Sequence, residues 1–385
     1  MRKLVSIQQV KDIMPIEGAD AIELAQINGW QCVVKKNEFK KGDLGVYFEI
    51  DSFLPIEPEF EFLRKSSYKK MGDQEGFRLK TVKLRGEISQ GLILPLSLFP
   101  KLFQLKHDTW INRLTNSILV IGEEFTDELK VEKYEAPIPA EISGDVCGIF
   151  PSFIPKTDEE RIQNLPDYFE KFKDVEFEES LKLDGTSMTV FRTFETINEQ
   201  TEQMDNLKGK FGVCMRNYEL KRSNTNTLWK VALDLKLHEI LDAENLEIAI
   251  QGELMGPGIQ KNREKFNKHE FFIFRIWDIK NRRFFTSKEK FDFIEKVKNK
   301  YGIELKHTPI INHNIKIFNF INSMNDMLSR ASGHSINNPI REGIVFKAHF
   351  SSSGDKNDGF GGNNNNEKFI SFKAINNLFL LKTND

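Results

Sequence analysis

Residues 180–188 read Ser-Leu-Lys-Leu-Asp-Gly-Thr-Ser-Met, and the interpretation of the chain starts from this stretch. Lys182 lies between two leucines, and Asp184 and Gly185 follow it. In a strand that leads into a turn, Lys182 and Asp184 face the same side, because side chains alternate along a strand. The glycine permits the turn and lets the backbone approach a ligand closely. The stretch therefore predicts a lysine and a carboxylate side by side next to a bound molecule.

Lys182 is a candidate nucleophile on chemical grounds. A lysine amine attacks only when it is neutral, and its ordinary pKa is about 10.4, so burial or nearby cations have to lower that pKa. The same pattern of residues also fits an exposed lysine in a turn. The motif therefore needs support from the rest of the chain.

Composition limits the class of protein. A length of 385 residues favours two domains, and 33 phenylalanines can pack several sheets. The net charge of −2 does not indicate a nucleic-acid partner, so such a partner would have to bind through local basic patches. The three cysteines, Cys32, Cys147 and Cys214, are far apart, which argues for reduced thiols and against a zinc finger.

The N-terminus has no apolar core of a secretory signal, and no stretch approaches the roughly 18 apolar residues of a membrane span. We therefore expect an intracellular protein, cytoplasmic or nuclear, that does not enter a membrane.

The first part of the chain, residues 1–135, is dominated by short runs rich in β-branched and aromatic residues with turn signals between them. These runs cover residues 4–7, 30–34, 44–50, 77–84 and 91–95. Short strands at this spacing predict a small β-barrel, with the OB-fold as the leading candidate.

A proline-containing connector is expected at 136–155, and a second unit at 156–385 mixes strands and helices, which makes the whole chain α+β. Its predicted strands cover 213–215, 249–253 and 271–277, and its predicted helices cover 227–241, 287–301 and 315–331. The Ser-, Gly- and Asn-rich stretch near 351–367 cannot bury enough apolar surface to offset its ordering entropy, so we expect a disordered loop there.

Five further short stretches follow Lys182 in a fixed order. They are Cys214-Met215-Arg216-Asn217, Gln251-Gly252-Glu253-Leu254, Phe271 to Ile279, Arg341 to Lys347, and Ser371-Phe372-Lys373-Ala374. With the lysine stretch they resemble the ordered motifs of the covalent nucleotidyltransferases, which include DNA ligases, RNA ligases and mRNA capping enzymes. Residues 153–164 and 256–262 resemble the branch of ATP-dependent RNA ligases of the Naegleria and Deinococcus type.

The resemblance implies a fold and a reaction. The fold would be an N-terminal OB-fold β-barrel followed by a nucleotidyltransferase domain built on antiparallel sheets with flanking helices. The reaction would join 3′-OH and 5′-phosphate ends of RNA, with ATP as co-substrate, through an adenylate on Lys182. It would use Mg²⁺ or Mn²⁺, whose preferred ligands include carboxylate oxygens.

The resemblance also implies residue roles. The catalytic set would be Lys182, Lys373, Arg161 and Asp184. The nucleotide would contact Lys182, Arg216, Asn217, Glu253, Phe272 and Lys373. The metal would be organised by Asp184, Glu253 and Glu342.

The residues themselves leave alternatives open. Arg161 and Arg216 also fit surface cations, and Glu253 and Glu342 also fit ion pairs at strand ends. Phe271, Phe272 and Phe274 are equally placed to stack on adenine.

The chain departs from the family pattern in three places. Met215 stands where serine is usual, and Ile375 stands where the last motif often has a second lysine, which leaves Lys382 as a possible substitute. The insert before Lys373 lengthens the distance to Glu342.

The expected partner is RNA, as loose ends or a nicked duplex. Basic residues recur in the N-terminal part, with Trp30 and Tyr68 near them; they are Lys35, Lys36, Lys40, Lys41, Lys69, Lys70, Lys80, Lys83 and Arg85. OB-folds hold nucleic acid by neutralising phosphates and stacking bases, although solvated loop lysines give the same pattern. We expect a monomer with no obligate protein partner.

Three other functions compete with this interpretation. A DNA ligase uses the same lysine chemistry. A capping enzyme carries its OB domain after the nucleotidyltransferase unit, whereas here the predicted barrel precedes Lys182. A decayed nucleic-acid-binding protein would not need Lys182, Glu253, Glu342 and Lys373 together.

Overall fold

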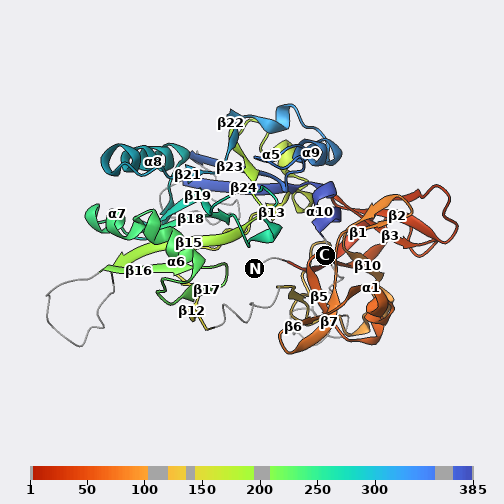
Figure 1. Cartoon of the computed structure of the whole chain (residues 1–385). Coiled ribbons are helices and arrows are strands. Elements are labelled where there is room, and N and C mark those ends of the chain that lie inside the picture. Colours follow the sequence, from red (N-terminus) through yellow and green to blue (C-terminus); the bar gives the residue numbers. More distant parts are fainter. Residues whose placement is uncertain (1–2, 103–119, 136–143, 195–208, 352–366, 384–385) are drawn as a thin grey trace, which may run out of the picture.

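The computed structural model describes residues 3–102, 120–135, 144–194, 209–351 and 367–383. Figure 1 shows an N-terminal barrel, in red and orange, beside a larger body coloured yellow to blue. Nearly all of the loop expected near 351–367 lies outside the described residues, as do residues 136–143 of the expected connector. No helix among the described residues is long and apolar enough to cross a membrane.

The barrel is built from two main sheets and a hairpin. The first sheet has the strand order β10 (Leu92–Pro95), β4 (Leu44–Phe48), β1 (Val5–Pro15), β2 (Ile22–Ile27) and β3 (Trp30–Lys35). The second has the order β11 (Glu132–Lys133), β5 (Ser52–Pro55), β7 (Gln74–Arg78) and β6 (Tyr68–Met71). The hairpin pairs β8 (Val82–Leu84) with β9 (Glu87–Ser89), and the short helices of this part are η1 (Pro58–Leu63), α1 (Arg64–Ser67) and η2 (Leu96–Leu98).

Alternation along the strands closes the barrel around apolar side chains. In β3 the even-numbered residues from Trp30 to Val34 are buried and the odd ones are more exposed, as expected for a strand with one face on a core. The predicted strand at 77–84 is not continuous. It divides into β7 and β8 because Leu79 turns inward, with its backbone bonded to Asp51 and Ser52.

The larger body contains two antiparallel sheets. The eight-stranded sheet has the order β12 (Val146–Ile149), β17 (Tyr218–Leu220), β16 (Gly209–Cys214), β15 (Thr186–Phe194), β18 (Ile248–Met255), β19 (Glu270–Asp278) and β20 (Arg283–Phe284), with β21 (Lys306–His307) beside β19. The five-stranded sheet has the order β13 (Glu160–Arg161), β24 (Glu367–Ile375), β23 (Gly343–Ser351), β14 (Phe177–Lys182) and β22 (Ile310–Ile315). Among the described strands of these sheets, only β13 with β24 and β19 with β21 are parallel.

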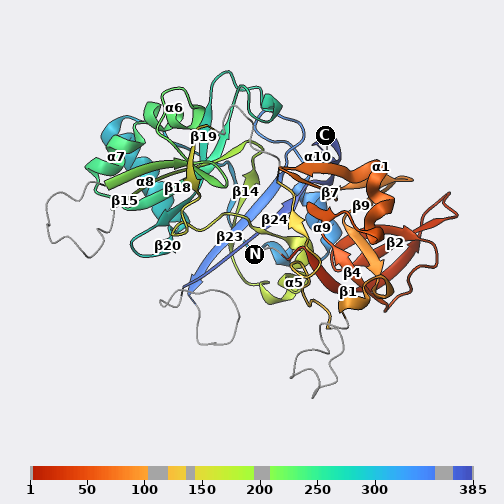
Figure 2. The same ribbon diagram turned by 90° about the horizontal axis from the view of Figure 1, so that it is seen from below.

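Helices flank these sheets, as Figures 1 and 2 show. They are η3 (Ile162–Asn164), α5 (Tyr168–Lys171), α6 (Thr227–Asp234), α7 (Leu237–Ala243), η4 (Gln260–Asn262), α8 (Ser287–Tyr301), η5 (Ile317–Asn319), α9 (Met324–Ala331) and α10 (Asn377–Thr383). The prediction for α8 is confirmed, and its N-terminus has a capping box between Thr286 and Glu289.

Two helix predictions are wrong in part. The helix expected over 227–241 is two helices, because Lys236 between them adopts a left-handed φ of 49°. The helix expected over 315–331 forms only at Met324–Ala331. Its first part is the end of β22 followed by η5, which places Ile317 and Phe318 in the core under the five-stranded sheet.

Part of the expected connector is a strand of the larger body, because β12 pairs with β17. The barrel contacts the larger body at η3, where the Trp30 indole donates to Asn164 Oδ1 at 2.5 Å and Asn164 donates to Glu49 at 2.6 Å. It also contacts α10, which lies next to the barrel in both views.

Gly343 offers a test of how tightly the central strands pack. A Cβ on this residue would lie 2.3 Å from the carbonyl oxygen of Ala374 on the neighbouring strand. We expect Gly343→Ala to lower the free energy of unfolding by about 2 kcal/mol or more, measured by urea denaturation. Gly148→Ala is the matched control, since nothing lies within 4 Å of the position that its added methyl group would take. Equal stability of the two variants would contradict the close approach.

Candidate active site

Lys182 is the last residue of β14, and it lies opposite Gly343 across the antiparallel pair with β23. Glu342 immediately precedes β23, so this register brings its carboxylate to the lysine. Lys182 Nζ lies 2.7 Å from Glu342 Oε1, and the two side chains are 27% and 16% exposed. The predicted nucleophile and one predicted metal ligand therefore form an ion pair with limited access to solvent.

Gly185 brings a second carboxylate to the same place. Its backbone N–H donates to Glu253 Oε1 at 2.9 Å. A Cβ on Gly185 would lie 2.4 Å from the carbonyl oxygen of Leu254, so the close approach of β18 requires glycine here. The turn after Lys182 thus positions Glu253 as well as Asp184.

Asp184, the third predicted carboxylate, accepts a hydrogen bond from Arg263 Nη1 to its Oδ2 at 2.7 Å. Arg263 comes from the loop after β18, and no pattern in the sequence had indicated it.

Burial and neighbouring negative charge disfavour the ionisation of Asp184 and Glu253. Burial raises the pKa of Glu253 to about 7, although the charge of Lys182 opposes this. Burial and then the charge of Glu342 raise the pKa of Asp184 to about 6, against the opposing charges of Arg263 and Lys182. Neighbouring negative charge and desolvation both disfavour an ionised carboxylate, so a bound cation would relieve the repulsion at this site.

By charge and by donor atom, these carboxylates fit a hydrated Mg²⁺ or Mn²⁺. The described residues nevertheless contain no group of three or more acidic, histidine or cysteine side chains already arranged to hold a metal. Magnesium usually keeps several of its waters, so the predicted contacts would run in part through those waters. The metal role of Asp184, Glu253 and Glu342 stays a prediction.

The pKa of Lys182 is raised, which is opposite to what a free nucleophile needs. Burial lowers this pKa, but it is outweighed by the charges of Glu342, Glu253 and Glu159 together with the hydrogen bond to Glu342. The expectation of a lowered pKa is therefore wrong for the protein alone, because the carboxylates that would organise a metal stabilise the ammonium when no metal is bound.

A cluster of cations around Asp158 forms a second part of the site. Lys133 and Arg216 lie 2.6 and 2.7 Å from Asp158 Oδ2, and Lys373 Nζ lies 3.7 Å from its Oδ1. Burial lowers the pKa of Lys373 to about 8, and the charge of Arg161 acts in the same direction. The charge of Lys182 acts in the same direction, and the two lysines lie on β14 and β24, which flank β23 in one sheet.

Asp158 had not been predicted, although it lies in the stretch 153–164 that carries the family resemblance. Burial raises its pKa, but the charges of Lys373, Arg216 and Lys133 outweigh the burial and leave the pKa well below its usual range. Lysine and arginine bind phosphate oxygens as they bind carboxylate oxygens, so the three cations around Asp158 could also bind a phosphate group. Lys133 is contributed by β11 of the barrel, and nothing in the sequence had indicated it.

Arg161 pairs through β13 with Lys373 of β24, which places the two predicted catalytic residues on adjacent strands. The Arg161 side chain is buried against the barrel, with Nη2 3.5 Å from Asp51 and the guanidinium carbon 5.8 Å from the Trp30 ring centroid. The position of the Arg161 side chain therefore depends on how the barrel packs against the larger body.

Asn217 lies at the edge of the cation cluster, where it donates to Glu135 and accepts from Lys156 at 2.9 Å. Lys382 is exposed on α10, and Ile375 is buried at the end of β24.

Phe272 is the phenylalanine that lies at the site. It is opposite Glu253 across the β18–β19 pair, and it packs in a small cluster with Leu181 and Leu183, the neighbours of Lys182. Phe271 packs instead in the core under the helices, and the backbone carbonyl of Phe274 accepts from Lys347. The register thus distinguishes three residues that the sequence could not separate.

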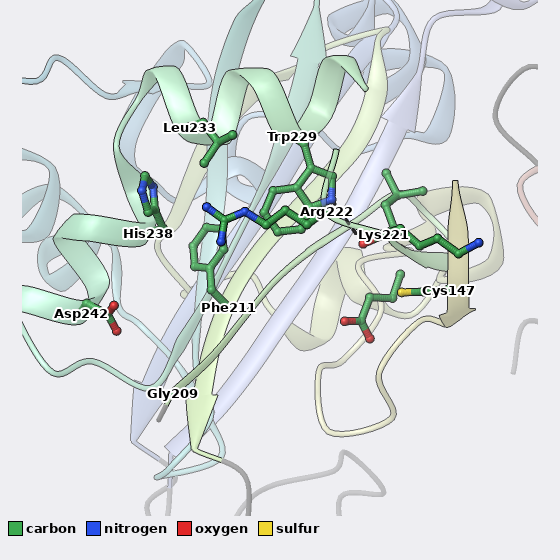
Figure 3. A pocket seen from close by; sticks show the side chains of 11 residues that line it. Cys147, Gly209, Phe211, Lys221, Arg222, Trp229, Leu233, His238 and Asp242 are labelled. Atoms are coloured by element: carbon green, nitrogen blue, oxygen red, sulfur yellow. Dashed lines mark hydrogen bonds between the residues drawn. The ribbon is translucent and has the colours of Figure 1, made fainter. Parts of the chain in front are cut away.

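A cavity of about 340 Å³ lies elsewhere, between β16, β17 and the helices α6 and α7. Figure 3 shows Phe211, Arg222, Trp229 and His238 around it. None of its lining residues belongs to the lysine, carboxylate or cation groups described above. We therefore assign the active site to those groups and not to this cavity.

Comparison with known proteins agrees with the fold. A profile of OB-fold domains matches residues 4–96, and a profile of RNA ligases matches residues 175–364. Solved structures of an RNA ligase of Naegleria gruberi match nearly the whole chain. A variant with AMP and Mn is 38% identical over 98% of each chain with a TM-score of 0.79, and a variant with ATP and Mn is 37% identical over 100% of each chain with a TM-score of 0.79. The form with pyrophosphate is 38% identical over 99% of this chain and 98% of that chain, with a TM-score of 0.78. No curated protein sequence matches the chain.

An OB barrel followed by two antiparallel sheets, with a lysine beside carboxylates between them, defines the class of covalent nucleotidyltransferases. Within that class, the chain belongs to the RNA ligase family. The predictions of an N-terminal OB-fold and of a ligase are confirmed.

The raised pKa of Glu253 predicts a pH dependence of stability in metal-free protein. Because the pKa of Glu253 is higher in the folded protein than in the unfolded chain, protonation of this side chain stabilises the fold. This stabilisation is complete below the unfolded-chain pKa of 4.5 and is lost as the pH rises through about 7. The free energy of unfolding, measured with urea, should therefore fall between pH 4.5 and 8 in the parent protein. In Glu253→Gln we expect this fall to be smaller by up to about 3 kcal/mol. Glu295→Gln, at an exposed position of α8, is the control. Parallel pH curves for all three proteins would refute the assignment.

Proposed function

We propose that this RNA ligase uses ATP and Mg²⁺ or Mn²⁺ to join a 3′-OH end to a 5′-phosphate end through an adenylate on Lys182. The observation that carries the proposal is the placement of Lys182, with Nζ 2.7 Å from Glu342 and on strand β14 of the sheet whose strand β24 carries the partly buried Lys373. The Naegleria ligase forms with ATP, AMP, pyrophosphate and Mn support the same co-substrates.

In the first step the neutral amine of Lys182 attacks the α-phosphorus of ATP. An N–P bond forms, and the bond to the bridging oxygen breaks with release of pyrophosphate. Lys182 has to give up the proton that the Glu342 ion pair now favours. A divalent cation on Asp184, Glu253 and Glu342 would supply the positive charge that favours the neutral amine and offsets charge on the phosphates.

The cation cluster would hold the phosphates during this step. Fixed positive charge comes from Lys373, Arg216 and Arg161. The transition state of phosphoryl transfer requires such charge to stabilise its oxygens. Asp158 now accepts the contacts that a phosphate would make, so it has to give up part of them when ATP binds. Phe272 would stack on adenine, and Asn217 would contact a ribose hydroxyl.

The two later steps regenerate the lysine and seal the strand. An oxygen of the RNA 5′-phosphate attacks the adenylate phosphorus, and the N–P bond to Lys182 breaks. The 3′-hydroxyl oxygen then attacks the 5′-phosphate phosphorus, a phosphodiester forms, and AMP leaves.

The RNA would contact basic residues of the barrel. We further propose RNA repair as the role of the enzyme, acting on loose ends or a nicked duplex, as an intracellular monomer in the cytoplasm or nucleus without an obligate protein partner.

Adenylylation tests the central proposal. Protein cleared of bound AMP is incubated with α-labelled ATP and Mg²⁺ or Mn²⁺, without RNA. We expect a label that is labile to acid and stable to alkali, as a phosphoramidate is, and that is absent from Lys182→Ala. No label on the folded parent protein would refute the proposal, and label on Lys182→Ala would refute Lys182 as its carrier.

The β8–β9 hairpin tests the contact with RNA, because it exposes Lys83 and Arg85. We expect Lys83→Ala with Arg85→Ala to weaken binding of single-stranded RNA and to reduce the slope of log Kd against log salt by about 1.4, if each contacts one phosphate. Lys298→Ala, at an exposed position of α8, should keep the parent slope. An unchanged slope in the double variant would place the RNA elsewhere.

A further inference from the structure

Arg263 lies between the active site and the C-terminal helix α10. Its Nη1 donates to Asp184 Oδ2 at 2.7 Å, and its guanidinium carbon lies 5.2 Å from the ring centroid of Phe379. Phe379 is buried on α10, so the planar guanidinium has an aromatic ring as one partner and a carboxylate as another. Both contacts are ones that arginine makes and lysine makes less well.

The loop that carries Arg263 is held in a costly conformation. Gln260, Lys261 and Asn262 have φ angles of 44°, 59° and 45°, although none of them is glycine. Such residues cost of order 1 kcal/mol each and persist only where the surroundings determine them. Here the Asn262 side chain closes the loop, because it donates to the Phe266 carbonyl at 2.8 Å and accepts from the Phe266 amide at 3.0 Å.

The residue after Arg263 anchors the loop from the other side. Glu264 is buried, and its Oε2 accepts from the backbone amides of Asn337 at 2.5 Å and Asn338 at 3.1 Å. Arg263 is therefore fixed on both sides, which is more constraint than an arginine making a surface ion pair requires.

Helix α10, which backs Arg263, is also joined to two other parts of the site. It follows directly on β24, the strand that carries Lys373. Asn376 lies between them, and its backbone amide donates to the Glu342 carbonyl at 2.9 Å while its side chain accepts from the Leu378 amide in the first turn of the helix.

The same helix contacts the barrel. Gln90, which is buried in the barrel wall, donates to Asn377 Oδ1 at 3.2 Å. Leu380 packs against the barrel core cluster that includes Trp30 and Ile93. A chain of direct contacts therefore runs from the barrel through α10 and Phe379 to Arg263 and Asp184.

We propose that Arg263 is a positioning residue for adenylylation, which orients the carboxylate of Asp184, and that α10 makes this orientation depend on the seating of the barrel. Arg263 Nη1 donates to Oδ2 of Asp184, and Oδ1 has no hydrogen-bond partner among the described residues. When the barrel contacts α10, Phe379 packs against Arg263, and Arg263 fixes the orientation of the Asp184 carboxylate. The inference rests on the proposed adenylylation of Lys182.

Single-turnover adenylylation at saturating ATP and Mg²⁺ tests the proposal. We expect Arg263→Met to lower the rate about 10- to 100-fold, the range for losing a hydrogen bond to a charged group, with the half-saturating ATP concentration changed by less than about twofold. Arg263→Lys should recover part of the rate, since it keeps the charge but loses the planar fork. Phe379→Leu should lower the rate about 3- to 10-fold.

Coupling between variants separates positioning from general packing. If Phe379 acts through Arg263, Phe379→Leu should have little further effect in the Arg263→Met background. Asn377→Ala, which removes the acceptor for Gln90, should lower the rate about threefold, the size of one neutral hydrogen bond. Leu378→Ala, exposed on the same helix, is the control and should keep the parent rate.

Each outcome has a defined meaning. A parent rate in Arg263→Met, or effects that simply multiply in the double variant, would overturn the proposal. Lowered thermal stability of Arg263→Met with an unchanged rate would assign Arg263 a structural role only. A parent rate in Asn377→Ala would overturn the link to the barrel. No label on the parent protein would instead refute the proposed function, so the two failures are distinguishable.

Discussion

The arrangement depends on one ion pair, that between Lys182 and Glu342 at 2.7 Å. A partly buried lysine is stabilised by a compensating charge, and so is a partly buried carboxylate. The pairing of β14 with β23 satisfies both, but only because glycines follow in each segment and allow the neighbouring strands to approach. The same carboxylates that stabilise the charged lysine also keep it protonated, so the proposed adenylylation would need a bound cation to favour the neutral amine.

Around that pair, charge is separated into two regions. Carboxylates gather next to the turn after Lys182, where burial raises the pKa values of Asp184 and Glu253. Cations gather around Asp158, where Lys133 from the barrel joins residues of the larger body. A nucleotide carries both features that match this division, since its phosphates need cations and its bound metal needs carboxylates. The barrel is therefore a part of the site as well as a candidate surface for RNA.

Local sequence was sufficient where one physical effect dominated. The α8 helix was predicted correctly, and the structure shows local signals that favour it, since a capping box begins it and Gly302 ends it. The strands β18 and β19 were predicted because they are long and apolar, as buried strands are. The helix prediction for 315–331 was wrong in its first part. Apolar residues there pack into the core from a strand end and a short 3₁₀ turn, and no local pattern distinguishes that arrangement from a buried helix.

The sequence by itself determined the chemistry-bearing residue types, their order, and the class of protein, because short motifs keep their local geometry wherever the chain carries them. Their ordered spacing led to Lys182, Glu253, Glu342 and Lys373, and the structure brings these residues into one region. Only the tertiary structure decided which phenylalanine lies at the site, because a bulge at Phe274 in β19 sets which residue of this strand lies opposite Glu253. It also decided that Asp158, Lys133 and Arg263 belong there. Arg263 reaches the site from a loop and Lys133 from the barrel, and such long-range contacts leave no periodicity or local motif in the sequence. Asp158 lies in a motif-bearing stretch, but the motif does not indicate its three cationic partners.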